Sequence, residues 1–522
     1  MMRFTLNRKI MKRIYKYTLV TILSMSLVMA CDNGFDEMNT NPVRLTSLDP
    51  VFQLNRALIE VAPGYGQLTY EVTIVRQMIT PFIGVGTGGN LNQDNRSATQ
   101  ANWQNFYRNV IDNLVSATEA ASMTAAEKPN IYNMLRIFKA YAFMVVTDTY
   151  GDIPYFQAGR GFIDGTVFPA YDPQQAIYMD ILNELSVASA ALNESADAVP
   201  QDALYGGNIS QWKKFGYSLL LRAAMRLSKV DPTTAAQYAS TAAAGGLMES
   251  NLDNAVVRHN ADFRNGVGTN VNGGQAPFYY LDEEFVNWMK DHNDPRLVSI
   301  AVRYVGAQQD GDQVEANADR SYDAQIGMPQ GYDNTSIPPI VADYGLASLY
   351  DFSQMDRSRF GNPEAPNFFV TYSQTRLLLA EAIVRGWVTG DAAAEYEAGI
   401  RGHMIQCALW PGDTEVAPAD IDAYVAANPL AAADEAAIEE INEQYWMSSY
   451  LSSHEVWANF RRSDYPNVAP NPYPGGDLTT EQFIRRLTYP DSEQSVNNEN
   501  LSAAISRQGP DILDTRVWWD AQ

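Results

Sequence analysis

Cysteine and histidine are scarce in this chain of 522 residues, which has two cysteines and four histidines. Cys31 has a separate predicted role, described below, so Cys407 is left without a partner and no intramolecular disulfide is expected. We interpret Cys407 as a buried, unreactive side chain. The histidines are scattered, and no two lie at the helical spacing of a zinc site. The sequence therefore predicts no metal or cofactor; only a structural calcium ion is left open, because oxygen ligands are plentiful.

Basic residues are also few. The chain has 37 Lys and Arg residues against 61 Asp and Glu residues, and its formal net charge is −24. An acidic field of this kind repels phosphate backbones, so nucleic acid is not an expected partner. A neutral ligand such as a glycan is compatible with it.

Motifs for catalysis are missing. The chain has neither a G-x-S-x-G nucleophile elbow nor a phosphate-binding G-x-x-x-x-G-K sequence. Gly84-x-Gly86-x-x-Gly89 has the dinucleotide spacing, but no strand pattern precedes it and no helix start follows directly, so we interpret it as a polar loop. Glu283-Glu284 could supply the two carboxylates of a glycoside hydrolase, yet the pattern favours a solvated helix start. We expect a protein that is not an enzyme, with an exported glycoside hydrolase as the remote alternative.

No apolar run reaches the roughly 20 residues that a membrane-spanning helix requires. A basic N-terminal stretch is followed by a short apolar run from Tyr17 to Ala30, which is the pattern of a secretory signal. The sequence Val28 to Cys31 resembles a bacterial lipobox. We therefore predict a signal peptide over residues 1–30, lipidation of Cys31 and a lipidated tether over residues 31–50. The membrane would be reached through the lipid anchor only.

Helical periodicity dominates the rest of the chain. Apolar residues recur at spacings of three and four between Ile177 and Leu192, and Asp172-Pro173 is predicted to cap that helix. Asp231-Pro232 is predicted to open another helix, which ends near Gly245-Gly246. The segment Arg376 to Met404 predicts two helices joined by a turn at Gly390-Asp391, and it resembles a tetratricopeptide unit. The expected fold is mainly α, with stacked helix pairs.

Four long polar stretches interrupt these helices, at residues 84–100, 260–274, 308–343 and 466–476. Loops of this length in a compact protein are usually functional or disordered, and the flanking aromatic residues favour ordered binding loops here. A shallow sugar site needs aromatic rings that stack on the sugar and polar groups that bind its hydroxyls. The candidate ligand-binding residues are Asn90, Asn92, Asn95, Arg96, Trp103, Asn272, Tyr279, Tyr280, Trp288 and Tyr332.

Short strings of sequence spread over the mature chain carry a family resemblance. They are FDEMNTNP (35–42), TDTYGDIPY (147–155), YDPQQAIY (171–178), WKKFGYSLLLRAAMR (212–226), NDPRL (293–297), LLLAEAIVRGW (377–387), EVWANFRRSDYP (455–466), RRLTYP (485–490) and VWWD (517–520). In this order they resemble the SusD/RagB family of Bacteroidetes surface lipoproteins, and more closely its SusD-like nutrient-binding branch.

The resemblance implies a mainly α-helical fold, with tetratricopeptide-like helix pairs on one side and a loop-rich ligand-binding side. It implies a single SusD-like domain over residues 51–522. It also implies an outer-membrane lipoprotein that faces the cell exterior and binds oligosaccharides, or peptides as in some members. The implied partner is a SusC-like TonB-dependent β-barrel transporter that receives the ligand.

Several of the strings that carry the resemblance have a structural interpretation of their own. The segment Tyr150 to Tyr155 is predicted to form a tight turn at the end of a helix. Arg461 and Arg462 are predicted to lie at a helix end, where cations complement the terminal carbonyls. Trp518 and Trp519 are predicted to anchor the C-terminus to the core.

Overall fold

The computed structural model describes residues 48–61, 68–84 and 87–521, together with residues 11, 13 and 15–18. Met1–Asp49 and Pro50–Gln522 form separate units, and the description below concerns the second. The predicted lipidation site at Cys31 lies outside the described residues.

Helices account for 53% and strands for 5% of the residues that the structure describes, which confirms the predicted mainly α fold. The longer helices are α3 (Pro50–Glu60), α5 (Arg96–Asn105), α6 (Asp112–Ser122), α7 (Pro129–Tyr150), α8 (Gln174–Ala191), α9 (Ile209–Arg226), α10 (Pro232–Gly245), α12 (Glu283–Asp291), α15 (Tyr372–Val384), α16 (Ala392–Gln406), α17 (Pro418–Ala427), α18 (Asp434–Ser448), α19 (Ser453–Ser463) and α21 (Asn498–Gln508). The shorter ones are α4 (Glu71–Ile74), α11 (Gly266–Val271), α13 (Arg296–Ile300), α14 (Pro338–Val341), α20 (Asp491–Val496), η2 (Gly89–Leu91), η7 (Ala342–Tyr344) and the π-helix η3 (Phe106–Ile111).

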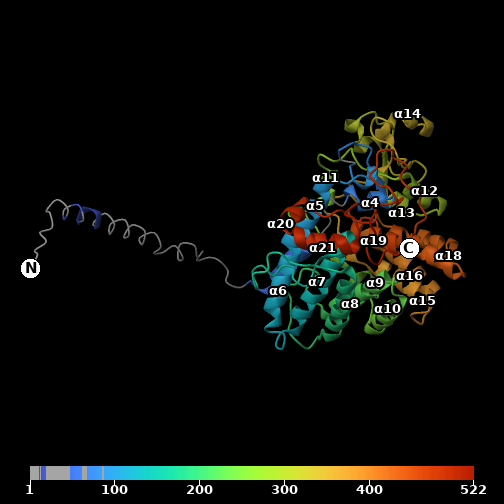
Figure 1. The fold of residues 1–522 in the computed structure, drawn as a ribbon. Helices are drawn as coiled ribbons and strands as arrows, with labels where there is room; N and C mark the ends of the chain where they lie inside the picture. Colours follow the sequence, from blue (N-terminus) through green and yellow to red (C-terminus); the bar gives the residue numbers. More distant parts are fainter. Residues whose placement is uncertain are drawn as a thin grey trace, which may run out of the picture. The chain divides into compact units, whose positions relative to one another are not determined.

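Consecutive helices pack side by side. Helix α7 contacts α8, α8 contacts α9 and α9 contacts α10, and all four lie in the lower part of Figure 1. Helix α15 packs against both α16 and α18. Each helix buries one face against its neighbour, so the stack forms a continuous hydrophobic core.

The pair α15–α16 confirms the predicted helix–turn–helix. Asp391 caps α16 by accepting a hydrogen bond from the backbone N–H of Ala394, 3.1 Å away. A Cβ atom added to Gly399 would lie 2.6 Å from Leu377 Cγ, so glycine is needed where the two helices cross. Asp231 caps α10 in the same way, as predicted, through the N–H of Thr234 at 3.0 Å.

The predicted cap of α8 is wrong in its detail. The helix is present, but Asp172 does not cap it; its carboxylate accepts hydrogen bonds from the backbone N–H groups of Tyr155 and Phe156. The N–H of Gln174 in the first turn donates instead to Asp152 Oδ1, 2.9 Å away. Asp152 follows Gly151, whose φ of 84° ends α7, so the predicted turn also supplies the cap of the next helix.

Arg461 and Arg462 lie in the last turn of α19, as predicted, and Nε of Arg461 donates to the carbonyl of Trp457 in that turn at 3.4 Å. Both side chains are nevertheless buried, and most of their contacts are to other elements. The guanidinium of Arg461 lies 3.7 Å from the ring centroid of Trp457 and 4.9 Å from that of Trp519. Arg462 forms a bidentate ion pair with Glu381 of α15. These arginines therefore join helices across the core.

The interpretations of Trp519 and Cys407 are confirmed. The Trp519 side chain is fully buried, and its indole N–H donates to Asp148 Oδ1 at 2.9 Å. Cys407 is buried and free, and burial raises the pKa of its thiol to about 12. A thiol with this pKa stays protonated at neutral pH, which makes it a poor nucleophile.

Strands are short and antiparallel, and they occur mainly between helical segments. They are β1 (Met78–Ile79), β2 (Ile153–Pro154), β3 (Tyr171–Asp172), β4 (Ala255–Val257), β5 (Tyr280–Leu281), β6 (Ala301–Tyr304), β7 (Ala318–Asp319), β8 (Gln354–Met355) and β9 (Asn367–Val370). Strand β1 pairs with β5, β2 with β3 and β4 with β9, and β6 lies between β7 and β8. The pairs β1–β5 and β6–β8 position the loops described next.

Candidate functional site

Three of the predicted polar loops meet at the end of the molecule where α14 lies (Figure 1). The side-chain amide of Asn471 donates to the carbonyl of Asn90, 2.6 Å away. The hydroxyl of Tyr473 donates to the carboxylate of Asp333 at 3.1 Å. We call the region formed by residues 78–84, 87–95, 275–282, 313–354 and 471–477 the loop junction.

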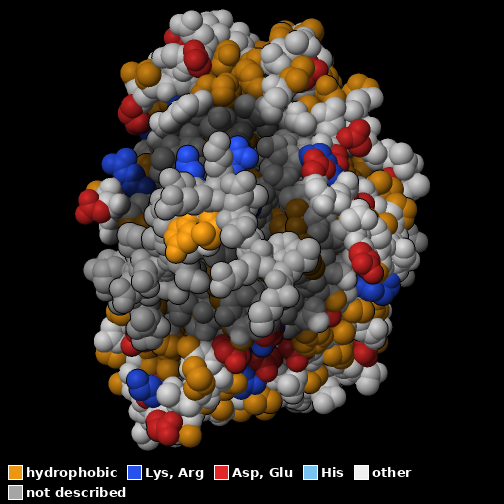
Figure 2. Space-filling model, turned by 60° about the vertical axis from the view of Figure 1, so that its left-hand side comes forward, with side chains coloured by type: hydrophobic (Ala, Val, Ile, Leu, Met, Phe, Trp, Pro, Cys, Tyr) orange, Lys and Arg blue, Asp and Glu red, His pale blue; other side chains and the backbone are white. Residues whose placement is uncertain are grey.

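A small hydrophobic cluster of its own supports the loop junction. Its buried members are Ile79, Tyr280, Met328, Ile337, Val341, Leu346 and Phe352, and the half-buried rings of Phe82, Tyr332 and Tyr344 pack against them. Hydrophobic side chains are visible at the upper edge of the face in Figure 2, at the height of α14 in Figure 1. The loops therefore pack as an ordered layer.

Three half-buried aromatic rings lie together in the loop junction. The ring centroids of Phe82 and Phe278 are 4.8 Å apart, and those of Phe82 and Tyr350 are 6.3 Å apart. Next to Phe82, Ile83 is 58% exposed. An aromatic group of this kind offers apolar surface on which the C–H face of a sugar ring can stack.

Glutamine side chains lie beside these rings with unsatisfied oxygens. The Oε1 atoms of Gln275, Gln313 and Gln354 are buried, and none has a hydrogen-bond partner in the described part of the chain. The amide nitrogen of Gln313 donates to the backbone carbonyl of Tyr350 at 3.1 Å, which holds the Gln313 side chain beside Tyr350. The amide nitrogen of Gln354 donates to the carbonyl of Ala276, two residues before Phe278.

These oxygens give the loop junction a specific hydrogen-bonding capacity. A buried acceptor without a donor costs about 1–3 kcal/mol. A hydroxyl that donates to it removes this cost. The half-buried rings are therefore the surface that a polyhydroxylated ligand can contact directly, and the three oxygens behind them have no exposed surface in this structure.

A buried ion pair holds the loop junction on the helical core. The Nε of Arg76 donates to Asp282 at 2.9 Å, and its Nη1 donates to the carbonyl of Ala469 at 2.8 Å. Asp282 also caps α12 through the N–H of Glu284. Burial raises the pKa of Asp282 to about 6, and Arg76 opposes this shift. Arg76, just before the start of β1, thus connects this segment with the start of α12 and the loop 466–476.

The predicted site residues Asn90, Tyr279 and Tyr280 lie in the loop junction but are buried. The Asn90 side chain bonds to both backbone groups of Thr80, and the hydroxyl of Tyr280 donates to the carbonyl of Pro277 at 2.8 Å. Their side chains present no surface to a ligand in this structure. Polar and aromatic loop residues serve here to hold the loops in place, and we no longer expect these three to contact ligand.

The other predicted polar residues are occupied by structural contacts. The Asn95 side chain caps α5 through the N–H of Ala98, and Asn92 adopts a φ of 51° at the end of η2. Arg96 pairs with Asp491 of α20 at 2.5 Å. Asn272 is exposed, and its amide donates to the carbonyl of Gly361 at 2.7 Å.

Among the predicted rings, only Tyr332 stays half-buried within the loop junction. Trp103 is 3% exposed and is surrounded by the rings of Tyr107, Tyr150, Tyr171 and Tyr489. Trp288 lies on α12, where it stacks on His292 and donates to Glu443 of α18.

Sequence reasoning missed Phe82, Tyr350 and the three glutamines. Gln275 and Phe278 lie just beyond the predicted loop 260–274, and a glutamine close to an aromatic residue was the available signal. Gln313 and Gln354 are distant in sequence from the rings they accompany, so no local pattern reveals them.

The acidic pair Glu283-Glu284 lies at a helix start. Helix α12 begins at Glu283, as predicted for a helix start, and Glu283 accepts a hydrogen bond from the hydroxyl of Tyr344 at 2.8 Å. Among the residues that are described, no three His, Cys, Asp or Glu side chains converge as metal ligands would. None of the described helices combines the length and the apolar character that crossing a membrane demands.

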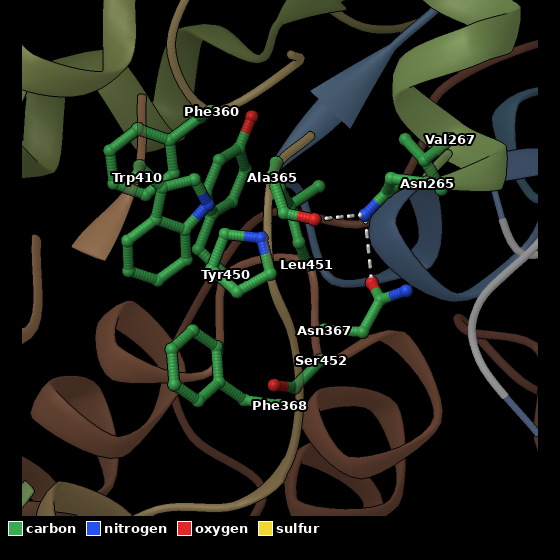
Figure 3. Close-up of a pocket in the computed structure, with 11 residues that line it drawn as sticks. Asn265, Val267, Phe360, Ala365, Asn367, Phe368, Trp410, Tyr450, Leu451 and Ser452 are labelled. Carbon is green, nitrogen blue, oxygen red and sulfur yellow. Dashed lines mark hydrogen bonds between the residues drawn. The ribbon is translucent and has the colours of Figure 1, made fainter. Parts of the chain in front are cut away.

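Figure 3 shows a small cavity lined by aromatic side chains, which include Phe360, Phe368 and Trp410. The amide of Asn265 donates to the carbonyl of Ala365 and to Asn367 Oδ1 at its edge (Figure 3). The cavity volume of about 20 Å³ holds no more than about one water molecule. This cavity is therefore too small to bind a sugar.

Comparison with known proteins places the chain in a family. A family model described as SusD-like, starch-binding and associating with the outer membrane matches residues 42–490. Among solved structures, a chitin-binding protein is 28% identical, with a TM-score of 0.79 over 91% of this chain and 100% of that chain. A SusD-like structure described as Bacteroidetes AC2a is 26% identical, with the same TM-score and coverage.

A SusD homolog from Bacteroides uniformis is 23% identical, with a TM-score of 0.74 over 91% of this chain and 99% of that chain, which supports the fold alone. No curated protein gives a significant match. Members of the matched family are non-catalytic binding proteins. The model match covers most of the chain, and the fold agrees over nearly all of its described length, so this chain belongs to the SusD-like family associated with the outer membrane.

Proposed function

We propose that this chain binds oligosaccharides at the loop junction. The observation that carries the proposal is the group of half-buried rings of Phe82, Phe278 and Tyr350 beside three buried, unsatisfied glutamine oxygens. The family description as starch-binding supports the same ligand class, and so does the chitin-binding relative at 28% identity. Affinities in the micromolar to millimolar range are expected, because a shallow surface leaves much of the ligand in water.

Phe278→Ala tests this proposal. Removing one stacked ring is expected to cost roughly 1 kcal/mol of binding free energy, which lowers affinity for chito- or malto-oligosaccharides about 5- to 10-fold. Isothermal titration calorimetry on the purified protein measures it. Phe52→Ala is the matched control, because Phe52 is 52% exposed on α3, outside the loop junction, and its loss is expected to leave affinity unchanged.

Two results of this titration would contradict the proposal. One is an unchanged affinity in Phe278→Ala. The other is binding of peptides with no binding of any glycan, which would keep the fold and the role but change the ligand class.

We further propose that the protein is a lipid-anchored partner of an outer-membrane transporter. Residues 1–30 are the signal peptide, residues 31–50 carry the lipid and the tether, and residues 51–522 form the binding domain. The lipid on Cys31 holds the domain at the outer cell surface beside a SusC-like TonB-dependent transporter, which receives the ligand. Support comes from the lipobox-like sequence, the family description and the separation of Met1–Asp49 from Pro50–Gln522 as a unit.

Cys31→Ser tests the anchor. This variant is expected to leave the membrane fraction, because an unacylated chain has no apolar anchor after signal cleavage, while its oligosaccharide affinity stays unchanged. Cys407→Ala is the matched control and is expected to stay with the membrane. Fractionation and immunoblotting measure both variants, and co-purification of a large β-barrel with the wild-type protein tests the partner. Membrane retention of Cys31→Ser would refute the lipid anchor.

A further inference from the structure

A groove of about 400 Å³ lies on the side of the molecule formed by α5, η3, α20 and the loop 154–169. It shares no lining residue with the loop junction. Trp103 and Tyr107 form part of its lining. The volume falls in the range of small-molecule sites, about 300–1,000 Å³, and is small for a docked helix.

One wall of the groove exposes large apolar side chains to solvent. Phe162 is 100% exposed, Val167 67% and Val496 63%. The loop that carries Phe162 is fastened at both ends. Arg160 pairs with Glu119 of α6 at 3.8 Å, and the side-chain amide of Asn497 donates to the carbonyl of Pro169 at 2.9 Å. An ordered loop that exposes a whole phenylalanine ring marks an interaction surface.

Helices α5, η3 and α6 contribute a polar stripe with free hydrogen-bonding capacity to the lining. Gln104, Arg108 and Asp112 follow one another at intervals of four residues along α5, η3 and α6, and all three line the groove. None of these side chains forms a hydrogen bond or ion pair within the described ranges of the chain. Arg108 and Asp112 would pair across one α-helical turn, but the π-helix η3 changes the spacing at that point.

The charges of the groove disfavour an anionic ligand. Its lining holds one cation, Arg108, and two carboxylates, Asp112 and Glu493, which leaves a net charge of −1. This excess repels an anion, and a neutral ligand is compatible with it. Glu493 already accepts a hydrogen bond from the hydroxyl of Tyr171 at 2.8 Å. The remaining donors and acceptors suit hydroxyl groups, and the exposed ring of Phe162 suits the apolar face of a sugar.

We propose that this groove is a second binding site for a short, neutral oligosaccharide, with one sugar unit stacked on Phe162 and its hydroxyls bonded to Gln104, Arg108 and Asp112. The proposal rests on the proposed function for the ligand class only. The location, the free polar groups and the exposed ring are independent of the loop junction. A chain with two sites could hold two parts of one long glycan and gain affinity from both.

Hydrogen-exchange mass spectrometry of the purified protein with chitotriose and with maltotriose tests the two sites separately. Binding in the groove is expected to slow exchange in residues 158–169 and 492–497, and binding at the loop junction in residues 275–282. Phe162→Ala is expected to raise the apparent dissociation constant read from residues 158–169 about 5- to 10-fold and to leave the value read from residues 275–282 unchanged. Phe168→Ala is the matched control, because Phe168 is 57% exposed on the same loop but does not line the groove.

The outcomes separate this proposal from the proposed function. Protection of residues 275–282 alone, with none at residues 158–169, would overturn the second site and leave the proposed function standing. Protection of residues 158–169 that is lost in Phe162→Ala supports the groove even if the loop junction shows none. Equal effects of Phe162→Ala and Phe168→Ala would overturn the stacking role of Phe162, and protection by a peptide but by neither trisaccharide would overturn the ligand class.

Discussion

Replacing Arg462 with methionine is expected to destabilise the protein by about 3–5 kcal/mol. Arg462 and Glu381 are both fully buried, and two parallel hydrogen bonds of 2.7 Å join them. Arg385 also pairs with Glu381, and the Asn442 amide donates to it at 3.1 Å. Without Arg462, the Glu381 carboxylate keeps one partly exposed cation and loses its bidentate partner in the core. The predicted destabilisation is large because a buried carboxylate in a low-dielectric core loses its main opposite charge.

Urea unfolding followed by circular dichroism measures this prediction. Arg401→Met is the control, because Arg401 pairs with Glu397 and Asp422 at the surface, where ion pairs contribute about 0–1 kcal/mol. The double variant Arg462→Met/Glu381→Met is expected to recover most of the lost stability, since it removes both charges. A loss below about 1 kcal/mol in Arg462→Met would show that the pair contributes little.

The same ion pair fixes the sign of a pH dependence. The arginines lower the pKa of Glu381 to about 2, below its value of about 4.3 in an unfolded chain. The stabilisation is therefore fully present above about pH 4.3 and is lost as pH falls through about 2. In Arg462→Met the pKa of Glu381 rises, so unfolding free energy is expected to depend less on pH between 4 and 2 than in the wild-type protein.

The helices could be predicted from the sequence because their signals are local. Apolar spacing identified α8, Asp231-Pro232 marked the start of α10, and Gly390-Asp391 marked the turn before α16. The predicted cap of α8 was wrong because the residue that caps this helix is not local in sequence. Asp152, which receives the N–H of Gln174, lies 22 residues away in sequence and is brought there by the end of α7.

The candidate site was less predictable because its parts come together only in the folded chain. Phe82, Phe278 and Tyr350 belong to three separate segments. Loop asparagines and tyrosines such as Asn90 and Tyr280 are typical of sugar sites, yet their side chains form hydrogen bonds with the backbone. Composition identified three of the loops that meet at the loop junction, and it could not separate the residues that hold a loop from those that face outward.

Trp519→Ala is expected to destabilise the protein by about 3–5 kcal/mol, the usual range for removing a buried tryptophan. The indole is fully buried, and the guanidinium carbons of Arg461 and Arg226 lie 4.9 and 5.8 Å from its ring centroid. Its N–H donates to Asp148, a buried carboxylate whose pKa is raised by burial. Alanine would leave a cavity, remove the ring face from two buried cations and take one donor from Asp148.

The neighbouring Trp518 provides the matched control for this prediction. It is only partly buried, and its ring centroid lies 6.5 Å from that of Tyr178. Trp518→Ala removes the same side chain from the adjacent position. Its loss of stability is expected to be about 1–2 kcal/mol smaller, because it leaves a smaller cavity and breaks no buried hydrogen bond. Thermal and urea unfolding of the two variants give the difference. Equal losses of stability in the two variants would contradict the role of Trp519 as the C-terminal anchor, because residue type alone would then explain them. A larger loss in Trp519→Ala would show that the contacts to Asp148 and the two arginines hold the C-terminus in the core.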